Sequence, residues 1–422
     1  MLIQFSTQNW KSLRDEQTLS LVKAKGDELV LNSFTANIQS PIELLRSAVI
    51  YGANAAGKTN FISALRAMKK IVLDSTKNQV GDEISVVPFA LDSEFSQSPT
   101  EFEVLFIAKD TKFQYGFSVT SETVVSEWLI AYPNGRPQKW FTRNLNKDES
   151  YSWSYGGSFL GQKQLWQEST RSNGLFLSTA TQLNSIQLKP IYDWFKSTLR
   201  IGSVAGWNPN YTASKCEAEE QKTKVLEFLR AADLDISDLN IVKEEIGVKH
   251  LPESMPDEVK QQFLDEMKNR HIYDIKTVHL GSQGQSVEFN FTDESDGTKK
   301  LFSFAGPWLD VLKNGRVLFI DELHDNLHPK LVKFLVELFH NPKTNLKNAQ
   351  LVFTTHETSI MNQEVFRRDQ IWFCEKSRDQ STRLYPLTDF SPKKGRENLE
   401  DAYLTGRYGA VPYVRKITEV ER

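Results

Sequence analysis

The chain has 422 residues, of which 39% are hydrophobic and 25% are charged, a composition that can bury a core and excludes a disordered chain. The 51 lysines and arginines nearly balance the 54 aspartates and glutamates, so the net charge of −3 provides no overall field that attracts nucleic acid. Two cysteines are too few for a disulfide framework. The chain shows neither a signal-peptide pattern nor an apolar run of the ~18 residues that a membrane helix needs. We therefore expect a cytoplasmic protein without membrane segments.

The first predicted core element is a short apolar strand, residues 46–51, which ends at a glycine-rich turn. The turn runs from Gly52 to Thr59 and matches the pattern G-x-x-x-x-G-K-[ST], and a helical pattern follows as far as Val72. In such a loop the backbone N–H groups and the positive end of the helix face phosphates, the lysine reaches the β- and γ-phosphates, and the hydroxyl binds Mg²⁺. The residues expected to bind the nucleotide are Gly52, Asn54, Ala55, Ala56, Gly57, Lys58, Thr59 and Asn60, with Thr59 also a metal ligand.

Two segments of different character follow the predicted helix. Between residues 84 and 153, short aromatic runs of alternating polarity are separated by turn residues, which predicts an antiparallel β-subdomain. Helical patterns predominate over 162–269, with amphipathic helices expected at 215–232 and 257–270. Neither helix is long enough to form an extended coiled-coil arm.

Strands and helices then alternate through the last part of the chain. We expect strands at 287–291, 317–320 and 351–355, helices at 298–313 and 329–340, and edge strands at 371–374 and 383–387. This alternation predicts a mainly parallel sheet that is covered on both faces. The expected domains are the first part of a nucleotide-binding lobe (1–83), the β-subdomain (84–160), a helical insertion (161–285) and the second part of the lobe (286–422).

An acidic pair closes the apolar strand at 317–320. Asp321 and Glu322 follow it at its carboxyl end, the edge at which ligands bind in open α/β sheets. Two solvated acids after a strand are common, but the phosphate loop earlier in the chain favours a nucleotide site. We expect Asp321 to hold Mg²⁺ through water and Glu322 to polarise the attacking water as general base.

Two further signals accompany the acidic pair. His356 ends the predicted strand at 351–355 and is expected to contact the γ-phosphate, the alternative being an ordinary polar loop residue. Ser295 and Gly297 stand at the N-terminus of the helix at 298–313, where backbone N–H groups bind anions. With the expected sheet order they would bind the γ-phosphate of a second subunit, whereas a simple N-cap is the alternative.

These four motifs, in this order, resemble the Walker A, signature, Walker B and switch-histidine set of ABC-type ATPases. The opening segment FSTQNWKSLRDEQTLSL resembles the first strands of the SMC/RecF branch. The segments ESDGTKKLF, IDELHDNLHP, TTHE and YLTGRYGAVPYV are similar to those of the AbiLi/RloA group of bacterial phage-defence ATPases. The resemblance implies an α/β fold of the P-loop ABC/SMC-head type, with a mixed, mainly parallel sheet, an antiparallel β-subdomain and a helical insertion.

The same resemblance implies a reaction and its cofactors. The chain would bind ATP and Mg²⁺ and hydrolyse ATP to ADP and phosphate, with Ser295 and Gly297 acting in trans so that ATP joins two copies in a homodimer. Asp296 departs from the family pattern, which commonly has glycine there. The implied catalytic residues are Lys58, Glu322 and His356, and the implied metal ligands are Thr59 and Asp321.

The partner implied by the resemblance is a separately encoded effector, such as a toprim-type nuclease, since the stretch after His356 is shorter than such a domain of ~100 residues. Two alternatives stay open. One is a nucleotide-gated scaffold or sensor with little hydrolysis. The other is a RecF-like DNA-repair ATPase that binds nucleic acid directly, which the near-neutral charge disfavours.

Two polar clusters receive ordinary interpretations. His324, Asp325 and His328 contain metal-ligand residue types, but we expect a loop that faces the partner subunit. The basic groups 367–368 and 393–396 could contact phosphates, but we expect solvated faces.

Overall fold

The computed structural model describes residues 1–202, 207–247, 251–252, 254–267 and 271–413. The last three residues of the helix predicted at 257–270, and Val414 of the C-terminal motif, lie outside the described residues. The chain divides into two compact units, and each is considered by itself. The first unit comprises residues 1–204, 312–325 and 332–422, and the second comprises 205–311 and 326–331.

A six-stranded sheet forms the centre of the first unit. Its order is β11-β15-β16-β5-β17-β18, and all neighbours are parallel except the antiparallel pair β17–β18. The predicted mainly parallel sheet is therefore confirmed. Its strands are β11 (Leu199–Ile201), β15 (Val317–Ile320), β16 (Gln350–Thr354), β5 (Ser47–Tyr51), β17 (Ile371–Lys376) and β18 (Thr382–Pro386).

Burial explains why the inner strands read as apolar runs. Every residue of β5, β15 and β16 is buried, as expected for strands covered on both faces. The helix α1 (Lys58–Asp74) follows β5 directly, and α9 (Pro329–His340) connects β15 to β16.

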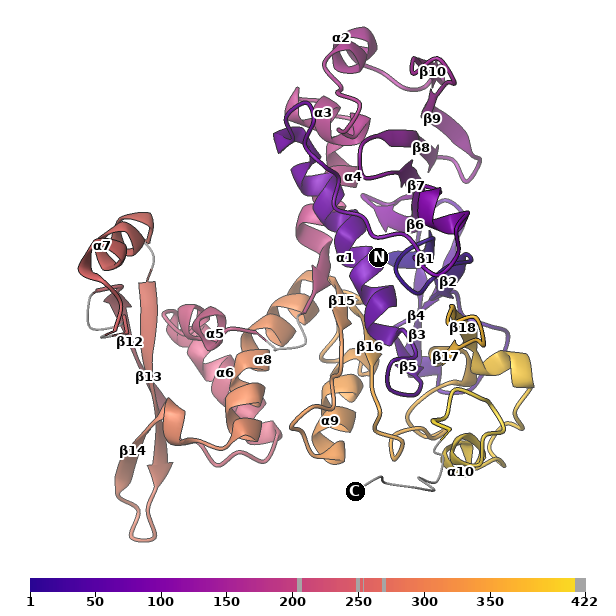
Figure 1. The fold of residues 1–422 in the computed structure, drawn as a ribbon. Coiled ribbons are helices and arrows are strands. Elements are labelled where there is room, and N and C mark those ends of the chain that lie inside the picture. The colour runs from indigo at the N-terminus through magenta and orange to yellow at the C-terminus, as the bar shows by residue number, and fades with distance from the viewer. Residues whose placement is uncertain (203–206, 248–250, 253, 268–270, 414–422) are drawn as a thin grey trace, which may run out of the picture. The chain divides into compact units, whose positions relative to one another are not determined.

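A seven-stranded antiparallel sheet forms the second layer of the first unit, in the order β10-β9-β8-β7-β6-β1-β2. The first strand of the chain, β1, pairs with both β2 and β6, so the N-terminal segment belongs to this sheet. Helix α1 contacts β1 and β6 (Figure 1). The rings of Phe5 in β1 and Phe61 in α1 lie 5.3 Å apart. The strands are β1 (Leu2–Gln8), β2 (Gln17–Ser20), β6 (Thr100–Ala108), β7 (Thr111–Val119), β8 (Val124–Tyr132), β9 (Gln138–Leu145) and β10 (Tyr151–Tyr155).

Smaller elements complete the first unit. A two-stranded antiparallel sheet pairs β3 with β4. Within the described residues, four further α-helices belong to this unit besides α1 and α9. The bounds are β3 (Ser33–Ala36), β4 (Ile42–Leu45), α2 (Lys163–Glu168), α3 (Phe176–Gln182), α4 (Lys189–Asp193) and α10 (Leu399–Leu404).

The second unit combines helices with a three-stranded antiparallel sheet in the order β12-β13-β14. The sequence predicted β14, but it did not predict β12 or β13. Only Leu239 of strand β12 (sequence DLNIVKEE) is buried, and the strand ends in three charged residues, so it lacks the sustained alternation of apolar and polar residues by which a strand is recognised. The elements are α5 (Pro209–Lys215), α6 (Glu219–Ala231), β12 (Asp238–Glu245), α7 (Asp257–Glu266), β13 (His271–Leu280), β14 (Ser286–Asn290) and α8 (Asp296–Asn314). Among the described residues, no helix is long and apolar enough to cross a membrane.

Candidate functional site

The predicted motifs of the first unit meet at one edge of the parallel sheet. Strand β16 lies between β5 and β15, and the register pairs Thr354 with Ile50 and Phe353 with Ile320. The three strands run in the same direction, so the residues that follow them leave the sheet side by side at its carboxyl edge. That edge is where ligands bind in open α/β sheets.

The phosphate loop after β5 is pressed against the neighbouring strands β17 and β18. Gly52 has a φ of 155°, and a Cβ atom built on it would lie 2.2 Å from the carbonyl oxygen of Cys374. Gly57 has a φ of 108°, and its Cβ would lie 2.2 Å from Oγ1 of Thr382. Both positions therefore require glycine, for space and for backbone conformation.

Two hydroxyl groups, from Ser12 and Thr382, hold the part of this loop around Ala56 and Asn60. Thr382 Oγ1 donates to the carbonyl oxygen of Ala56 at 2.8 Å, so Ser12 Oγ donates in turn to Thr382 Oγ1, also at 2.8 Å. Ser12 Oγ also accepts from the side-chain amide of Asn60 at 2.7 Å. The sequence analysis missed Ser12 and Thr382, because no local pattern signals a contact between segments so distant in the chain.

Lys58 is buried at the centre of the loop, with 5% of its surface exposed. Its Nζ donates to the carbonyl oxygens of Gly52 at 2.7 Å and Ala53 at 3.0 Å, and lies 3.1 Å from Nε2 of His356. Burial lowers the pKa of Lys58, and the nearby carboxylates of Asp321 and Glu322 oppose that shift.

His356 is held in its neutral form beside this ammonium group. Burial, and then the charge of Lys58, lower the pKa of His356 to about 4. A protonated lysine can only donate, so Nε2 of the neutral ring accepts from Lys58 and the ring proton lies on Nδ1. The backbone N–H of His356 lies 3.5 Å from Nδ1 of His324, and the two rings are 5.5 Å apart.

The acidic pair after β15 is held by one residue of β16. Asp321 is 3% exposed, and its Oδ1 accepts from Thr354 Oγ1 at 2.6 Å. The backbone N–H of Glu322 donates to the same hydroxyl oxygen at 2.7 Å. Glu322 adopts the left-handed region with a φ of 54°, a conformation that non-glycine residues rarely adopt.

One oxygen of this pair suits a divalent cation. Oδ2 of Asp321 is buried and forms no hydrogen bond within the described part of the chain. A buried carboxylate oxygen with free lone pairs is the ligand type that Mg²⁺ or its water shell requires. The side chain of Thr59, at the start of α1, is exposed. Asp321 and Thr59 together therefore provide oxygens of the kind that hold Mg²⁺ in phosphate-binding sites.

Ser295 and Gly297 belong to the second unit, whereas Lys58, Asp321 and His356 belong to the first. Ser295 is exposed, and its Oγ accepts from the backbone N–H of Thr298 at 3.1 Å, which makes it the N-cap of α8. A Cβ at Gly297 would make only ordinary contacts, so no close approach requires glycine there.

The basic group 367–368 differs from the expected solvated face. Arg367 is fully buried and pairs with Asp369 at 2.8 Å, and it also donates to the carbonyl oxygen of Ala24 at 3.2 Å. Arg368 pairs with Glu28 at 3.2 Å. The prediction of a solvated face is therefore wrong for Arg367, whose role in the fold is to anchor the segment before β3. By contrast, Lys393, Lys394 and Arg396 are exposed.

No group of three or more His, Cys, Asp or Glu side chains within the described ranges could hold a metal ion on its own. His328 uses Nδ1 to accept the backbone N–H of Lys330 at 3.2 Å, at the start of α9.

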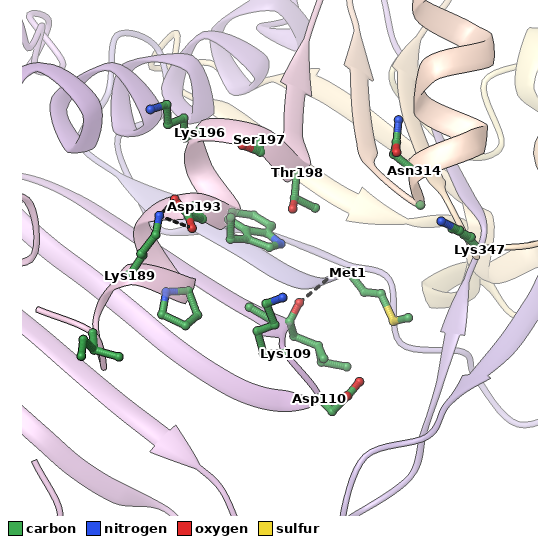
Figure 2. A pocket seen from close by; sticks show the side chains of 16 residues that line it. Met1, Lys109, Asp110, Lys189, Asp193, Lys196, Ser197, Thr198, Asn314 and Lys347 are labelled. Atoms are coloured by element: carbon green, nitrogen blue, oxygen red, sulfur yellow. Dashed lines mark hydrogen bonds and ion pairs between the residues drawn. The ribbon is translucent and has the colours of Figure 1, made fainter. Parts of the chain in front are cut away.

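A separate hollow of about 770 Å³ lies at the opposite edge of the parallel sheet. Asn314 and Lys347, which line it, precede β15 and β16 (Figure 2). Lys109 and Lys196 also line it, as do Lys189 and Asp193, which form an ion pair at 2.7 Å. None of the predicted site residues lines this hollow.

Residues 47–362 match a family described as "AAA domain, putative AbiEii toxin, Type IV TA system". No curated protein sequence matches the chain.

Several solved structures resemble the chain at low sequence identity. An SMC head domain from Thermotoga maritima has 13% identity and a TM-score of 0.38, covering 91% of this chain and 98% of that one. An SmcHead bound to the C-winged helix domain of ScpA has 12% identity and a TM-score of 0.41, covering 91% and 96%. An Smc head domain with an extended coiled coil, bound to the C-terminal domain of ScpA derived from Pyrococcus furiosus, has 12% identity and a TM-score of 0.37, covering 92% and 97%.

The family match spans 316 residues (47 to 362), which is more than half of the 422 in the chain and includes the phosphate loop, the acidic pair and His356. The chain has the fold of a nucleotide-binding P-loop ATPase, and it belongs to the AAA-domain family that this description names.

Proposed function

We propose that the chain is an ATP hydrolase that binds ATP and Mg²⁺ at the carboxyl edge of its parallel sheet. One observation carries the proposal. Lys58 from the loop after β5 and His356 from the end of β16 are 3.1 Å apart, and the buried carboxylate of Asp321 acts electrostatically on both. A buried lysine and two acids at one sheet edge supply the phosphate-binding, metal-holding and water-orienting groups that phosphoryl transfer to water uses, and the neutral histidine lies beside them.

Each residue then has a distinct task. Lys58 would bind the β- and γ-phosphates, exchanging the carbonyl oxygens of Gly52 and Ala53 for phosphate oxygens. Thr59 and Asp321 would hold Mg²⁺, which neutralises charge on the phosphates when bound. The backbone N–H groups of the loop, from Gly52 to Asn60, would surround the phosphates.

The chemical step falls to Glu322 and His356. Glu322 would accept a proton from a water molecule as the oxygen of that water attacks the γ-phosphorus. The bond between the γ-phosphorus and the β,γ-bridging oxygen would then break to release ADP and phosphate. His356, neutral and with its Nε2 facing Lys58, would contact the γ-phosphate and report its loss.

We propose further that the working form is a homodimer with ATP between the subunits. The helix α8 has 19 residues, and its N-terminus carries the exposed Ser295 with Gly297 two positions later. A helix N-terminus binds anions through its free N–H groups, so this end of one subunit would bind the γ-phosphate held by the other.

The biological role that we propose is control of a separately encoded effector in bacterial defence, with the chain acting in the cytoplasm. The segments after β14 that resemble phage-defence ATPases support this role. So does the family description, which names a toxin of a type IV TA system.

Phosphate release by the purified full-length chain tests the enzymatic proposal. We expect ATP turnover in the wild type and its loss in Glu322→Gln, with the variant trapped as an ATP-bound dimer of doubled molar mass in light scattering. Lys58→Ala should lose both turnover and dimer. A wild type that binds ATP and dimerises without turnover would replace the hydrolase by a nucleotide-gated scaffold, and unchanged turnover in Glu322→Gln would refute the role of Glu322.

A further inference from the structure

Thr354, the last residue of β16, holds the acidic pair in place through three separate contacts. Its hydroxyl contacts Oδ1 of Asp321 at 2.6 Å and the backbone nitrogen of Glu322 at 2.7 Å. Its carbonyl oxygen accepts from the backbone N–H of Leu323 at 3.1 Å. Thr354 is fully buried, so these contacts have no competition from solvent.

The direction of each hydrogen bond at this hydroxyl is determined. A threonine hydroxyl has one proton to donate and two lone pairs that accept. The backbone N–H of Glu322 can only donate, so it occupies a lone pair of Thr354 Oγ1. The single hydroxyl proton is therefore free to go to Oδ1 of Asp321, and Oδ2 is left without a partner in the described structure.

This arrangement links two groups with different tasks in the proposed reaction. One hydroxyl orients the carboxylate that would face Mg²⁺ and the backbone of the residue that would act as general base. Glu322 also has a positive φ of 54°, a strained conformation that persists only where surrounding contacts hold it, and the bond from its N–H to Thr354 is one such contact. His356 follows Thr354 by two residues, so the end of β16 also carries the histidine that contacts Lys58.

We infer that Thr354 is a positioning residue of the ATPase site, which sets the orientation of Asp321 for Mg²⁺ and of Glu322 for water. This inference rests on the proposed hydrolase function. Thr354 itself contacts neither nucleotide nor water in this scheme, and acts only through the two acids. A hydrogen-bond partner of a metal ligand typically contributes 10- to 100-fold to metal affinity or activity.

Thr354→Val and Thr354→Ser separate positioning from packing. Valine has the shape of threonine and favours strands, but it leaves Oδ1 of Asp321 and the N–H of Glu322 unpaired, whereas serine retains the hydroxyl. Thr7→Val is the matched control, because Thr7 is also a buried strand threonine and its Oγ1 donates to the carbonyl oxygen of Glu101 at 3.0 Å, in the other sheet.

We expect Thr354→Val to lower kcat about 10- to 100-fold with little change in the KM for ATP, since Lys58 and its loop are untouched. The apparent affinity for Mg²⁺ in the presence of ATP should fall by a similar factor. Thr354→Ser should retain most of the wild-type kcat, and Thr7→Val should lower Tm without lowering kcat.

The outcomes distinguish this inference from the proposed function. If the wild type hydrolyses ATP and Thr354→Val matches it in kcat and in Mg²⁺ affinity, the inference is wrong while the hydrolase stands. If the wild type does not hydrolyse ATP, the hydrolase proposal fails. The inference about Thr354 is then decided by how strongly Mg²⁺ promotes the binding of a fluorescent ATP analogue. An equal effect of Mg²⁺ in wild type and Thr354→Val overturns the inference, and a weaker effect in the variant supports it.

Discussion

Nζ of Lys58 lies 3.1 Å from Nε2 of His356, although 298 residues separate the two in the chain. The contact joins the loop after β5 to the end of β16, and it satisfies a buried ammonium group that would otherwise have only two carbonyl acceptors. These contacts hold the lysine in the position from which we propose that it binds phosphate. Burial disfavours its charged form and lowers the pKa of Lys58.

Replacing the charged side chain of Lys58 should therefore weaken ATP binding without lowering the stability of the nucleotide-free protein. We expect Lys58→Met, which keeps the length of the side chain, to weaken ATP binding about 10- to 100-fold, since a hydrogen bond to a charged group contributes ~1.5–3 kcal/mol. The Tm of the nucleotide-free protein should stay equal or rise, because methionine buries no charge. Calorimetric titration with ATP and a thermal melt measure the two effects. A Tm that falls by several degrees would mean that the ammonium stabilises the empty loop.

The phosphate loop makes a second, steric prediction. Gly52→Ala would place Cβ 2.2 Å from a backbone oxygen of Cys374, which cannot rotate away as a side chain can. We expect this variant to lose ATP binding and to unfold at a lower temperature. Gly157→Ala is the matched control, because nothing lies within 4 Å of its added Cβ. Equal ATP affinity in the two variants would show that the loop does not depend on its contact with β17.

The features that the sequence predicted are those with local signatures. The loop from Gly52 to Thr59 carries its own glycines and lysine, and Asp321 and His356 each follow an apolar strand, so spacing and polarity sufficed to predict a nucleotide site. The burial of β5, β15 and β16 agrees with the expected parallel sheet covered on both faces, whereas the position of β16 between the other two is known only from the strand pairing.

The features that the sequence did not predict depend on contacts between segments that are distant in the chain. Thr354 and Thr382 look like ordinary strand threonines, and only the register with β15 and the approach of the loop to β18 give their hydroxyls a partner. Arg367 resembles a surface residue in the sequence, because the carbonyl groups of Ala24 and Glu28 to which it donates become its neighbours only after folding.

Acid stability offers a third prediction, from a buried histidine outside the site. His340 is 6% exposed, its Nε2 lies 2.7 Å from Oγ of Ser47, and burial lowers its pKa to about 3. The folded protein excludes a proton that the unfolded chain binds below pH ~6.5, so stability should fall as the pH drops from about 6.5 towards 3. The expected slope from this residue is ~1.4 kcal/mol per pH unit.

Urea unfolding between pH 8 and pH 5 measures this slope. His340→Gln removes the titrating group, so its free energy of unfolding should depend less steeply on pH than that of the wild type by about one proton. Parallel pH dependence in the two proteins would contradict the assignment to His340.

The fourth prediction concerns the buried pair of Arg367 and Asp369. Arg367 is completely buried and Asp369 is 7% exposed, so Arg367→Ala leaves a carboxylate without its partner in the interior. Breaking a buried pair in this way costs about 3–5 kcal/mol, whereas replacing both partners with apolar residues costs less. We expect Arg367→Ala to unfold at much lower urea concentrations, and Arg367→Met with Asp369→Leu to recover part of the loss. The affinity for ATP should not change under conditions in which the variants are folded, because this pair lies outside the phosphate loop. A loss of ATP binding with normal stability would instead assign Arg367 to the nucleotide site.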